Sequence, residues 1–192
     1  MKLEYPLYPL FTPPFRFAEI EKMSKNEARA AFEWFVAESP KRIALLTEAV
    51  KRDTGVVLDF SEESLITVWK WAIPYFTPRN TPPCGISMEE TGMKPSPSNE
   101  GLHIVGQCLT YDVGYYLAEV MMRRCPSVKW MLWVRKTFPH NQAVLSGFSL
   151  PTSPRHMVQK RALYVLEGNV DSTALADAFR KTIETVAPQT SG

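Results

Sequence analysis

Cysteine is scarce in this sequence, and the few cysteines form no recognisable framework. The 192 residues include three, Cys84, Cys108 and Cys125. Their number is odd, their spacing is irregular and no CxxC pair occurs, so we expect three reduced thiols rather than disulfides. Reduced thiols are typical of an intracellular protein.

Histidine and glycine are too few or too scattered for several common sites. The three histidines, His103, His140 and His156, lie far apart, and none has a second ligand at metal-binding spacing. The nine glycines form neither a phosphate loop nor a dinucleotide fingerprint, and no GxSxG nucleophile elbow occurs. We therefore expect no metal and no cofactor, and we find no catalytic motif.

An excess of charge of one sign and a long apolar run are absent as well. Basic residues number 22 and acidic residues 20, for a net charge of +2, with the two signs mixed along the chain. No basic stripe is present that could follow phosphates, so we expect no nucleic-acid partner. No stretch reaches the roughly 20 apolar residues that span a bilayer. Pro6 and Pro9 interrupt the region where a signal peptide would be apolar, so we expect a cytoplasmic protein with no membrane segment.

The residues that are present favour one folded domain over 1–192. The apolar share of 45% and the charged share of 22% are ordinary for a globular protein. Residues 1–23 are rich in proline and aromatic residues, which predicts an extended arm whose rings pack on the body. Residues 77–100 contain five prolines, which predicts a long irregular loop. Residues 187–192 are expected to form a flexible tail.

Helical signals divide the sequence into about six helices. Ser24 and Glu27 have the spacing of a capping box, in which each satisfies a free backbone N–H. Ser39-Pro40 predicts a new helix, because proline suits the first helical turn, so we expect residues 24–55 to form an antiparallel pair. Further helices are predicted from Ser61, from Gly101 to Cys125, from Ser153 to Gly168, and from a cap at Asp171 or Ser172.

Alternating apolar and polar residues predict two strands, 128–135 and 143–148, joined by a turn at 138–141. A lone hairpin is marginal in water, so it must pack on helices or gain a third strand from residues 56–60 or 162–166. These signals together predict an α+β fold that is mainly helical. About six helices surround a long buried central helix, beside a small antiparallel β-hairpin or sheet.

The predicted helix over 101–125 is apolar nearly all round, which is typical of a buried helix. One row on it is polar and carries Asp112, Tyr116, Glu119 and Arg123 at spacings of three or four residues. Burial of a bare carboxylate is costly, so both carboxylates must be paired, hydrogen-bonded or open to a cleft. The row is therefore a candidate binding site, in which either carboxylate could act as an acid, a base or an anchor.

A structural network is the alternative interpretation of the same row. Glu119 and Arg123 could form an intrahelical ion pair, while Asp112 accepts hydrogen bonds from another element. Nearby aromatic residues could line a site or simply fill the core, since large rings dominate core burial. These candidates for an aromatic lining are Tyr111, Tyr115, Trp130 and Trp133.

Three segments carry a resemblance to known proteins: residues 111–119, residues 129–130 and residues 141–148. In this pattern the chain resembles small uncharacterised bacterial proteins of the immunity-protein type, some of which resemble partners of secreted toxins. The resemblance implies a protein that binds another protein stoichiometrically, and it carries no catalytic residue.

We therefore expect a non-enzymatic protein-binding protein, of the immunity or antitoxin type. Aromatic residues in the arm support this expectation, because interface centres favour Trp, Tyr, Met and Arg. The alternative is an enzyme or small-molecule-binding protein that uses the row from Asp112 to Arg123, covered by residues 77–100. A third hypothesis is a homo-oligomer that pairs through the edge of the predicted hairpin.

Overall fold

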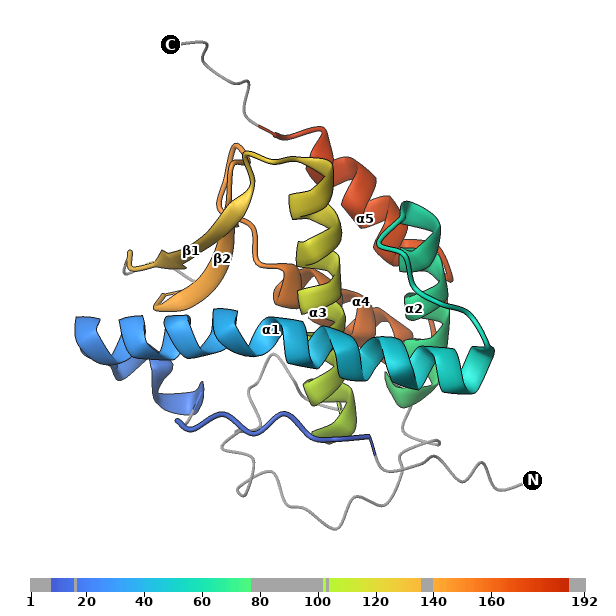
Figure 1. Ribbon diagram of the computed structural model, residues 1–192, viewed down its shortest axis with the longest axis horizontal. Coiled ribbons are helices and arrows are strands. Elements are labelled where there is room, and N and C mark those ends of the chain that lie inside the picture. The colour runs from blue at the N-terminus through green and yellow to red at the C-terminus, as the bar shows by residue number, and fades with distance from the viewer. Residues whose placement is uncertain (1–7, 16, 77–101, 103, 136–139, 187–192) are drawn as a thin grey trace.

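The computed structural model describes residues 8–15, 17–76, 102, 104–135 and 140–186, which form a mainly helical body with one small sheet (Figure 1). Its elements are η1 (Phe17–Lys22), α1 (Lys25–Thr54), α2 (Glu62–Phe76), α3 (Ile104–Arg124), β1 (Lys129–Trp133), β2 (Gln142–Ser146), α4 (Pro154–Leu166) and α5 (Ala174–Ile183). The predicted α+β class is confirmed. The predicted number of about six helices is too high for the described residues, which form five α-helices and the short 3-10 helix η1.

Helix α1 is continuous over 30 residues, so the prediction of an antiparallel pair that divides at Ser39-Pro40 is wrong. The predicted capping box of Ser24 and Glu27 is formed, and Gly55 ends the helix with a positive φ. A proline inside a helix costs about 3 kcal/mol, because it removes a backbone hydrogen bond. Buried positions nevertheless recur in phase on both sides of the exposed Pro40: Ala28, Ala31, Phe35, Ser39, Arg42, Leu46 and Ala49. Burial of this whole stripe offsets the cost of the proline.

Helix α3 is the centre of the described fold, as predicted. Every residue from Ile104 to Met121 is buried except Glu119. Helices α1, α2, α4 and α5 all pack against it. Figure 1 shows α3 crossing α1, with the hairpin on one side of α3 and the pair α2 and α5 on the other. A helix with neighbours on every side has no solvent face to make polar, which is why its sequence is apolar nearly all round.

The shorter helices begin close to their predicted starts. The Ser61 hydroxyl accepts a hydrogen bond from the first turn of α2, and the Ser153 hydroxyl accepts one from the first turn of α4. The N-cap residue of α5 is Thr173, one residue beyond the predicted alternatives. The Asp171 carboxylate accepts from the Thr173 N–H at 2.9 Å and so still orders this turn. Pro74 lies inside the last turn of α2, which ends two residues later at Phe76.

Strands β1 and β2 pair antiparallel, with Lys129 opposite Ser146 and Trp133 opposite Gln142. Neither predicted source of a third strand supplies one. Residues 56–60 form no strand, and residues 162–166 belong to α4, because their apolar positions face the helical core. The hairpin instead packs against α1, and isolated bridges join Leu145 to Thr152 and, just beyond β2, Phe148 to Val186.

Residues 8–15, which we call the arm segment, form neither helix nor strand. In Figure 1 the arm segment is dark blue and runs beside α1 and across α3. Of the arm predicted over 1–23, residues 17–22 form η1. Outside the described residues lie the predicted loop at 77–100, the predicted tail at 187–192 and residues 138–139 of the predicted turn. Within the described ranges, no helix is both long enough and apolar enough to cross a membrane.

Gly114 sets the distance between α3 and α4, and its replacement provides a first test of the packing. A Cβ at this position would lie 3.0 Å from the backbone N and Cα of Arg155. We expect Gly114→Ala to destabilise the fold by about 1–3 kcal/mol, because α4 must shift to accept the methyl group. At an unobstructed helical site the same change stabilises by roughly 1 kcal/mol. Denaturant unfolding gives the sign, and a stabilised variant would contradict the close approach.

Candidate functional site

The polar row of α3 divides between separate networks. Asp112 is fully buried and forms a bidentate ion pair with Arg42 of α1. The Arg42 Nε donates to Asp112 Oδ1 at 2.8 Å, and Nη2 donates to Oδ2 at 2.5 Å. The Tyr8 hydroxyl donates to the same Oδ2 at 2.7 Å. Asp112, which had to be either paired or open to a cleft, therefore accepts three hydrogen bonds, two from Arg42 and one from Tyr8.

The Arg42 guanidinium also holds the arm segment. Its Nη2 donates to the Pro9 carbonyl at 2.7 Å, and its Nη1 donates to the Leu10 carbonyl at 3.4 Å. The guanidinium carbon lies 5.8 Å from the centre of the Tyr8 ring and 5.6 Å from that of the Phe11 ring. One buried cation thus satisfies a carboxylate and two backbone carbonyls at once, which compensates for its removal from water.

Burial and pairing act in opposite directions on these groups. Burial raises the pKa of the Asp112 carboxyl, while the hydrogen bonds and charge of Arg42 lower it. Burial lowers the pKa of Arg42, but hydrogen bonds to Asp112 and its charge raise that pKa above the ordinary value. We expect Arg42 to stay protonated, since its charge is matched at hydrogen-bonding distance. Burial first, and the charge of Asp112 second, raise the pKa of the Tyr8 hydroxyl, so Tyr8 is a donor.

Tyr116 lies in a second network, at the start of α2. Its hydroxyl accepts from the Phe60 N–H at 2.9 Å and lies 2.6 Å from the Ser64 hydroxyl. The Phe60 ring stacks on the Tyr116 ring with centres 5.0 Å apart. Phe60 has a positive φ of 64°, which is uncommon for a bulky residue. Tyr116 therefore holds a tight connection between α1 and α2.

Glu119 and Arg123 form the intrahelical pair predicted in the structural alternative. The Arg123 Nε donates to Glu119 Oε1 at 2.8 Å, and both side chains are partly exposed. The Arg123 guanidinium carbon also lies 3.7 Å from the centre of the Phe60 ring. An exposed pair of this kind contributes only about 0.3–0.5 kcal/mol. Tyr116 and Arg123 therefore both contact Phe60, and Glu119 is paired with Arg123, whereas Asp112 bonds to Arg42 and Tyr8.

Three of the four aromatic candidates lie in one cluster with α1 and the arm segment. Tyr111 stacks on Phe11 with ring centres 4.8 Å apart. The Tyr115 hydroxyl donates to the Phe35 carbonyl at 2.8 Å, and Trp130 meets Phe35 edge-on at 5.5 Å. The fourth candidate, Trp133, lies at the end of β1, where the Arg135 guanidinium carbon is 5.1 Å from its ring centre. The cluster of three packs between α1, α3 and β1.

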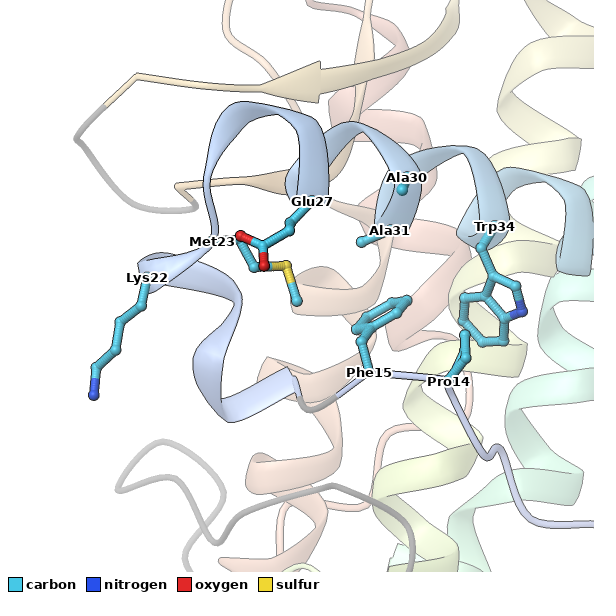
Figure 2. Close-up of a pocket in the computed structure, with 8 residues that line it drawn as sticks. All are labelled: Pro14, Phe15, Lys22, Met23, Glu27, Ala30, Ala31 and Trp34. Carbon is cyan, nitrogen blue, oxygen red and sulfur yellow. The ribbon is translucent and has the colours of Figure 1, made fainter.

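A pocket of about 510 Å³ opens at the junction of the arm segment, η1 and the beginning of α1. We call it the Trp34 pocket, lined by Pro14, Phe15, Lys22, Met23, Glu27, Ala30, Ala31 and Trp34. Figure 2 shows Met23 and Glu27 on one side, Phe15 and Trp34 on the other, and the Lys22 side chain pointing away. The Phe15 and Trp34 rings meet edge-on at 5.3 Å. None of the four residues of the polar row lines this pocket.

The sulfur and imidazole groups form no metal centre in the described part of the chain. Cys108 is buried and Cys125 partly buried, and neither forms a disulfide, while Cys84 and His103 lie outside the described residues. Among the described residues, no three His, Cys, Asp or Glu side chains are grouped so that they could hold a metal ion. His140 Nδ1 lies 2.8 Å from the Arg135 carbonyl.

The sequence interpretation missed Tyr8, Arg42 and the residues of the Trp34 pocket. A signal for Arg42 was present, because it occupies an inward position of the α1 stripe, where a charged residue needs a buried partner. The sequence gives no comparable indication of the pocket. Its alanine, proline and aromatic residues come from the arm segment, η1 and the beginning of α1, and their pattern does not show how these segments fold back on one another.

Comparison with known proteins identified no relative: no protein-family model, curated protein or solved structure matches this chain. The resemblance to immunity-type proteins therefore stays a prediction.

Removal of the Asp112 charge tests whether the hydrogen bonds among Asp112, Arg42 and the arm segment serve to stabilise the fold. We expect Asp112→Asn to destabilise the fold by about 3–5 kcal/mol, because Arg42 is left as an unpaired buried cation. Adding Arg42→Met should cost less than the sum of the two single changes, as for any directly coupled pair. Glu119→Gln is the matched control on the exposed pair and should change stability by less than about 0.5 kcal/mol. A carboxylate kept open for a ligand would give the opposite result for Asp112→Asn, a neutral or stabilised protein.

His156 predicts a pH dependence of stability. Its Nδ1 lies 2.8 Å from the Ser153 hydroxyl, and burial followed by the nearby Arg155 charge lowers its pKa to about 3. The unfolded chain, with an ordinary pKa near 6.5, binds a proton between these values that the folded chain does not. Stability is therefore lost as the pH falls below about 6.5.

Substitution at His156 isolates that contribution. Between pH 7 and about pH 4.5, the wild type should lose more free energy of unfolding than His156→Gln, which has no proton to take up. Urea unfolding at both pH values measures the two losses, and the pH 7 comparison separates the pH effect from any change in packing. Parallel losses in both proteins would contradict a neutral, partly buried His156.

Proposed function

We propose that this chain is a non-enzymatic protein-binding protein whose partner inserts an apolar anchor side chain into the Trp34 pocket. The observation that carries the proposal is the composition of that pocket. Its walls are aromatic rings, proline, alanine and a methionine thioether. Trp, Phe and Met are enriched where interfaces are most buried, and binding energy concentrates where an anchor fills such a pocket.

The charged residues of the pocket support binding rather than a chemical step. The Glu27 carboxylate accepts from the Ser24 N–H at 2.8 Å, as part of the α1 capping box. Its pKa is lowered by hydrogen bonds from Ser24, so it is an anion at neutral pH and a poor proton donor. Lys22 directs its side chain away from the apolar walls (Figure 2). A polar rim around an apolar centre is the usual arrangement of a protein interface.

The alternative of an enzyme or small-molecule-binding protein that uses the α3 row has less support. The Asp112 carboxylate is closed by Arg42 and Tyr8, and the Tyr116 hydroxyl is bonded at the start of α2. An acid, base or anchor in that row would first have to break a buried network. The Trp34 pocket needs no such rearrangement, because it is already open.

The finer proposal is a partner of the toxin type, with this chain as its immunity or antitoxin protein. Its support is the resemblance over residues 111–119, 129–130 and 141–148, together with the pocket as an anchor site. A toxin gene beside the gene for this chain is the observation expected. Neighbouring genes of unrelated function would leave the protein-binding proposal in place but contradict the toxin partner.

A pair of substitutions on α1 tests the Trp34 pocket as the docking site. Ala30 lines the pocket and Ala37 lies two turns further along the same helix, and both are exposed. Ala30→Glu places a charge at the apolar wall, whereas Ala37→Glu adds the same charge outside the pocket. Both keep a strong helix former, so thermal stability should hardly change. We expect Ala30→Glu to weaken partner binding at least roughly tenfold and Ala37→Glu to leave it unchanged.

The measurement is affinity purification from the cells that produce the chain, followed by titration of the purified partner against the three proteins. Capture of one partner by the wild type and Ala37→Glu, and its loss with Ala30→Glu, supports the proposal. Recovery of free monomer alone, or equal binding by all three proteins, contradicts it.

A further inference from the structure

The arm segment packs against side chains of α1, α2 and α3, which together we call the arm seat. Tyr8 and Phe11 are 7% and 1% exposed, so their rings are fully enclosed there. The seat is built by Trp34 and Arg42 of α1, Trp71 of α2, and Tyr111 and Asp112 of α3. The arm segment itself adds no helix and no strand to the fold.

The seat recognises four features of an extended segment. Asp112 accepts from a phenolic hydroxyl at 2.7 Å, beside Trp71 at a ring distance of 6.0 Å. Arg42 donates to the next two backbone carbonyls. A second ring, that of Phe11, stacks on Tyr111 and meets Trp34 at 5.5 Å.

Proline suits the position between the two rings. The backbone hydrogen bonds between Arg42 and the arm segment are made to carbonyl oxygens, so the missing N–H of Pro9 costs nothing in this contact. Proline also holds the backbone extended before binding, which lowers the entropy lost when the segment docks. Proline-rich segments are commonly recognised in this way, by grooves lined with aromatic rings.

The seat is held together by contacts that do not involve the arm segment. The bidentate bonds between Arg42 and Asp112 join α1 directly to α3. Tyr115 joins the same two helices through its bond to the Phe35 carbonyl. Departure of the arm segment therefore breaks none of these contacts between α1 and α3, and it breaks no helical or strand hydrogen bonds.

We propose that the arm seat is a second binding site, for an extended segment of another protein with the pattern Tyr-Pro-x-Phe, and that the arm segment occupies it in competition. This proposal does not depend on the Trp34 pocket being a docking site. A tethered segment acts at an effective concentration in the millimolar range, so it weakens the apparent affinity for a free segment. Loosening the arm segment should therefore strengthen binding of the competitor.

Two peptides test the proposal by fluorescence anisotropy with the full-length chain. The first, labelled, has the sequence of residues 8–15. The second keeps only its Tyr, Pro and Phe at the positions of Tyr8, Pro9 and Phe11, with alanine elsewhere. Both should bind the wild type saturably, and both should bind Phe11→Ala about tenfold more tightly, since that variant has lost its own ring from the seat. Thr12→Ala, an exposed change in the same segment, is the matched control and should bind like the wild type.

Several results would overturn the proposal. They are absence of binding, equal binding by the wild type and Phe11→Ala, and binding of a peptide that has alanine in place of the Phe. If Phe11→Ala does not fold, Tyr8→Phe removes only the hydroxyl that Asp112 accepts, and the same but smaller gain is expected. A dimer of the wild type in light scattering, dispersed by the peptide, would assign the seat to the arm of a second copy and also overturn the proposal. Ala30→Glu should bind the second peptide normally, which separates this site from the Trp34 pocket, because that peptide has alanine in place of the Pro14 and Phe15 that line the pocket.

Discussion

Arg42 and Asp112 lie 70 positions apart in the sequence and meet in the interior with almost no exposure to water. Burial removes the hydrogen bonds that two charged groups make to water. The pair is tolerated only if partners within the protein replace those bonds. The Tyr8 hydroxyl replaces one such bond at the carboxylate, and the carbonyls of Pro9 and Leu10 replace two at the guanidinium. The packing of α1 on α3 and the position of the arm segment together meet this requirement.

Polar groups on α3 determine which neighbour packs on which side of it. Apolar surfaces attract without direction, so a helix that is apolar nearly all round could accept its neighbours in several arrangements. The Tyr115 hydroxyl needs an acceptor and finds it on α1, while Tyr116 needs partners and finds them at the start of α2. Gly114 allows α4 to approach closely on a further side. Each polar or small residue thus excludes alternative packings that the apolar residues alone would permit.

Both proposed sites use α1. The Trp34 pocket lies where the arm segment meets η1, and the arm seat combines residues of α1 and α2 with Tyr111 and Asp112 of α3. Trp34 takes part in both, as it contacts Phe11 in the arm seat and lines the Trp34 pocket. The beginning of α1 is therefore a platform on which two neighbouring sites can be tested separately.

Local signals in the sequence determined most element boundaries. The capping box at Ser24, the glycine that ends α1 and the alternation in the hairpin depend on residues within a few positions of each other, so they can be read without the fold. The prediction of a helix break at Pro40 was wrong. It considered the cost of proline in a helix but not the stabilisation from the buried stripe, which continues in phase on both sides of Pro40.

Only the tertiary structure decided what the polar row does. From the sequence, Asp112 had to be paired or open, and Glu119 and Arg123 had the spacing of a pair. The partners of Asp112 come from the arm segment and from α1, and no local rule connects residues so far apart in the chain. The Trp34 pocket is likewise a property of how three segments fold back on one another. Long-range partners and cavities depend on packing geometry, which a single sequence constrains but does not specify.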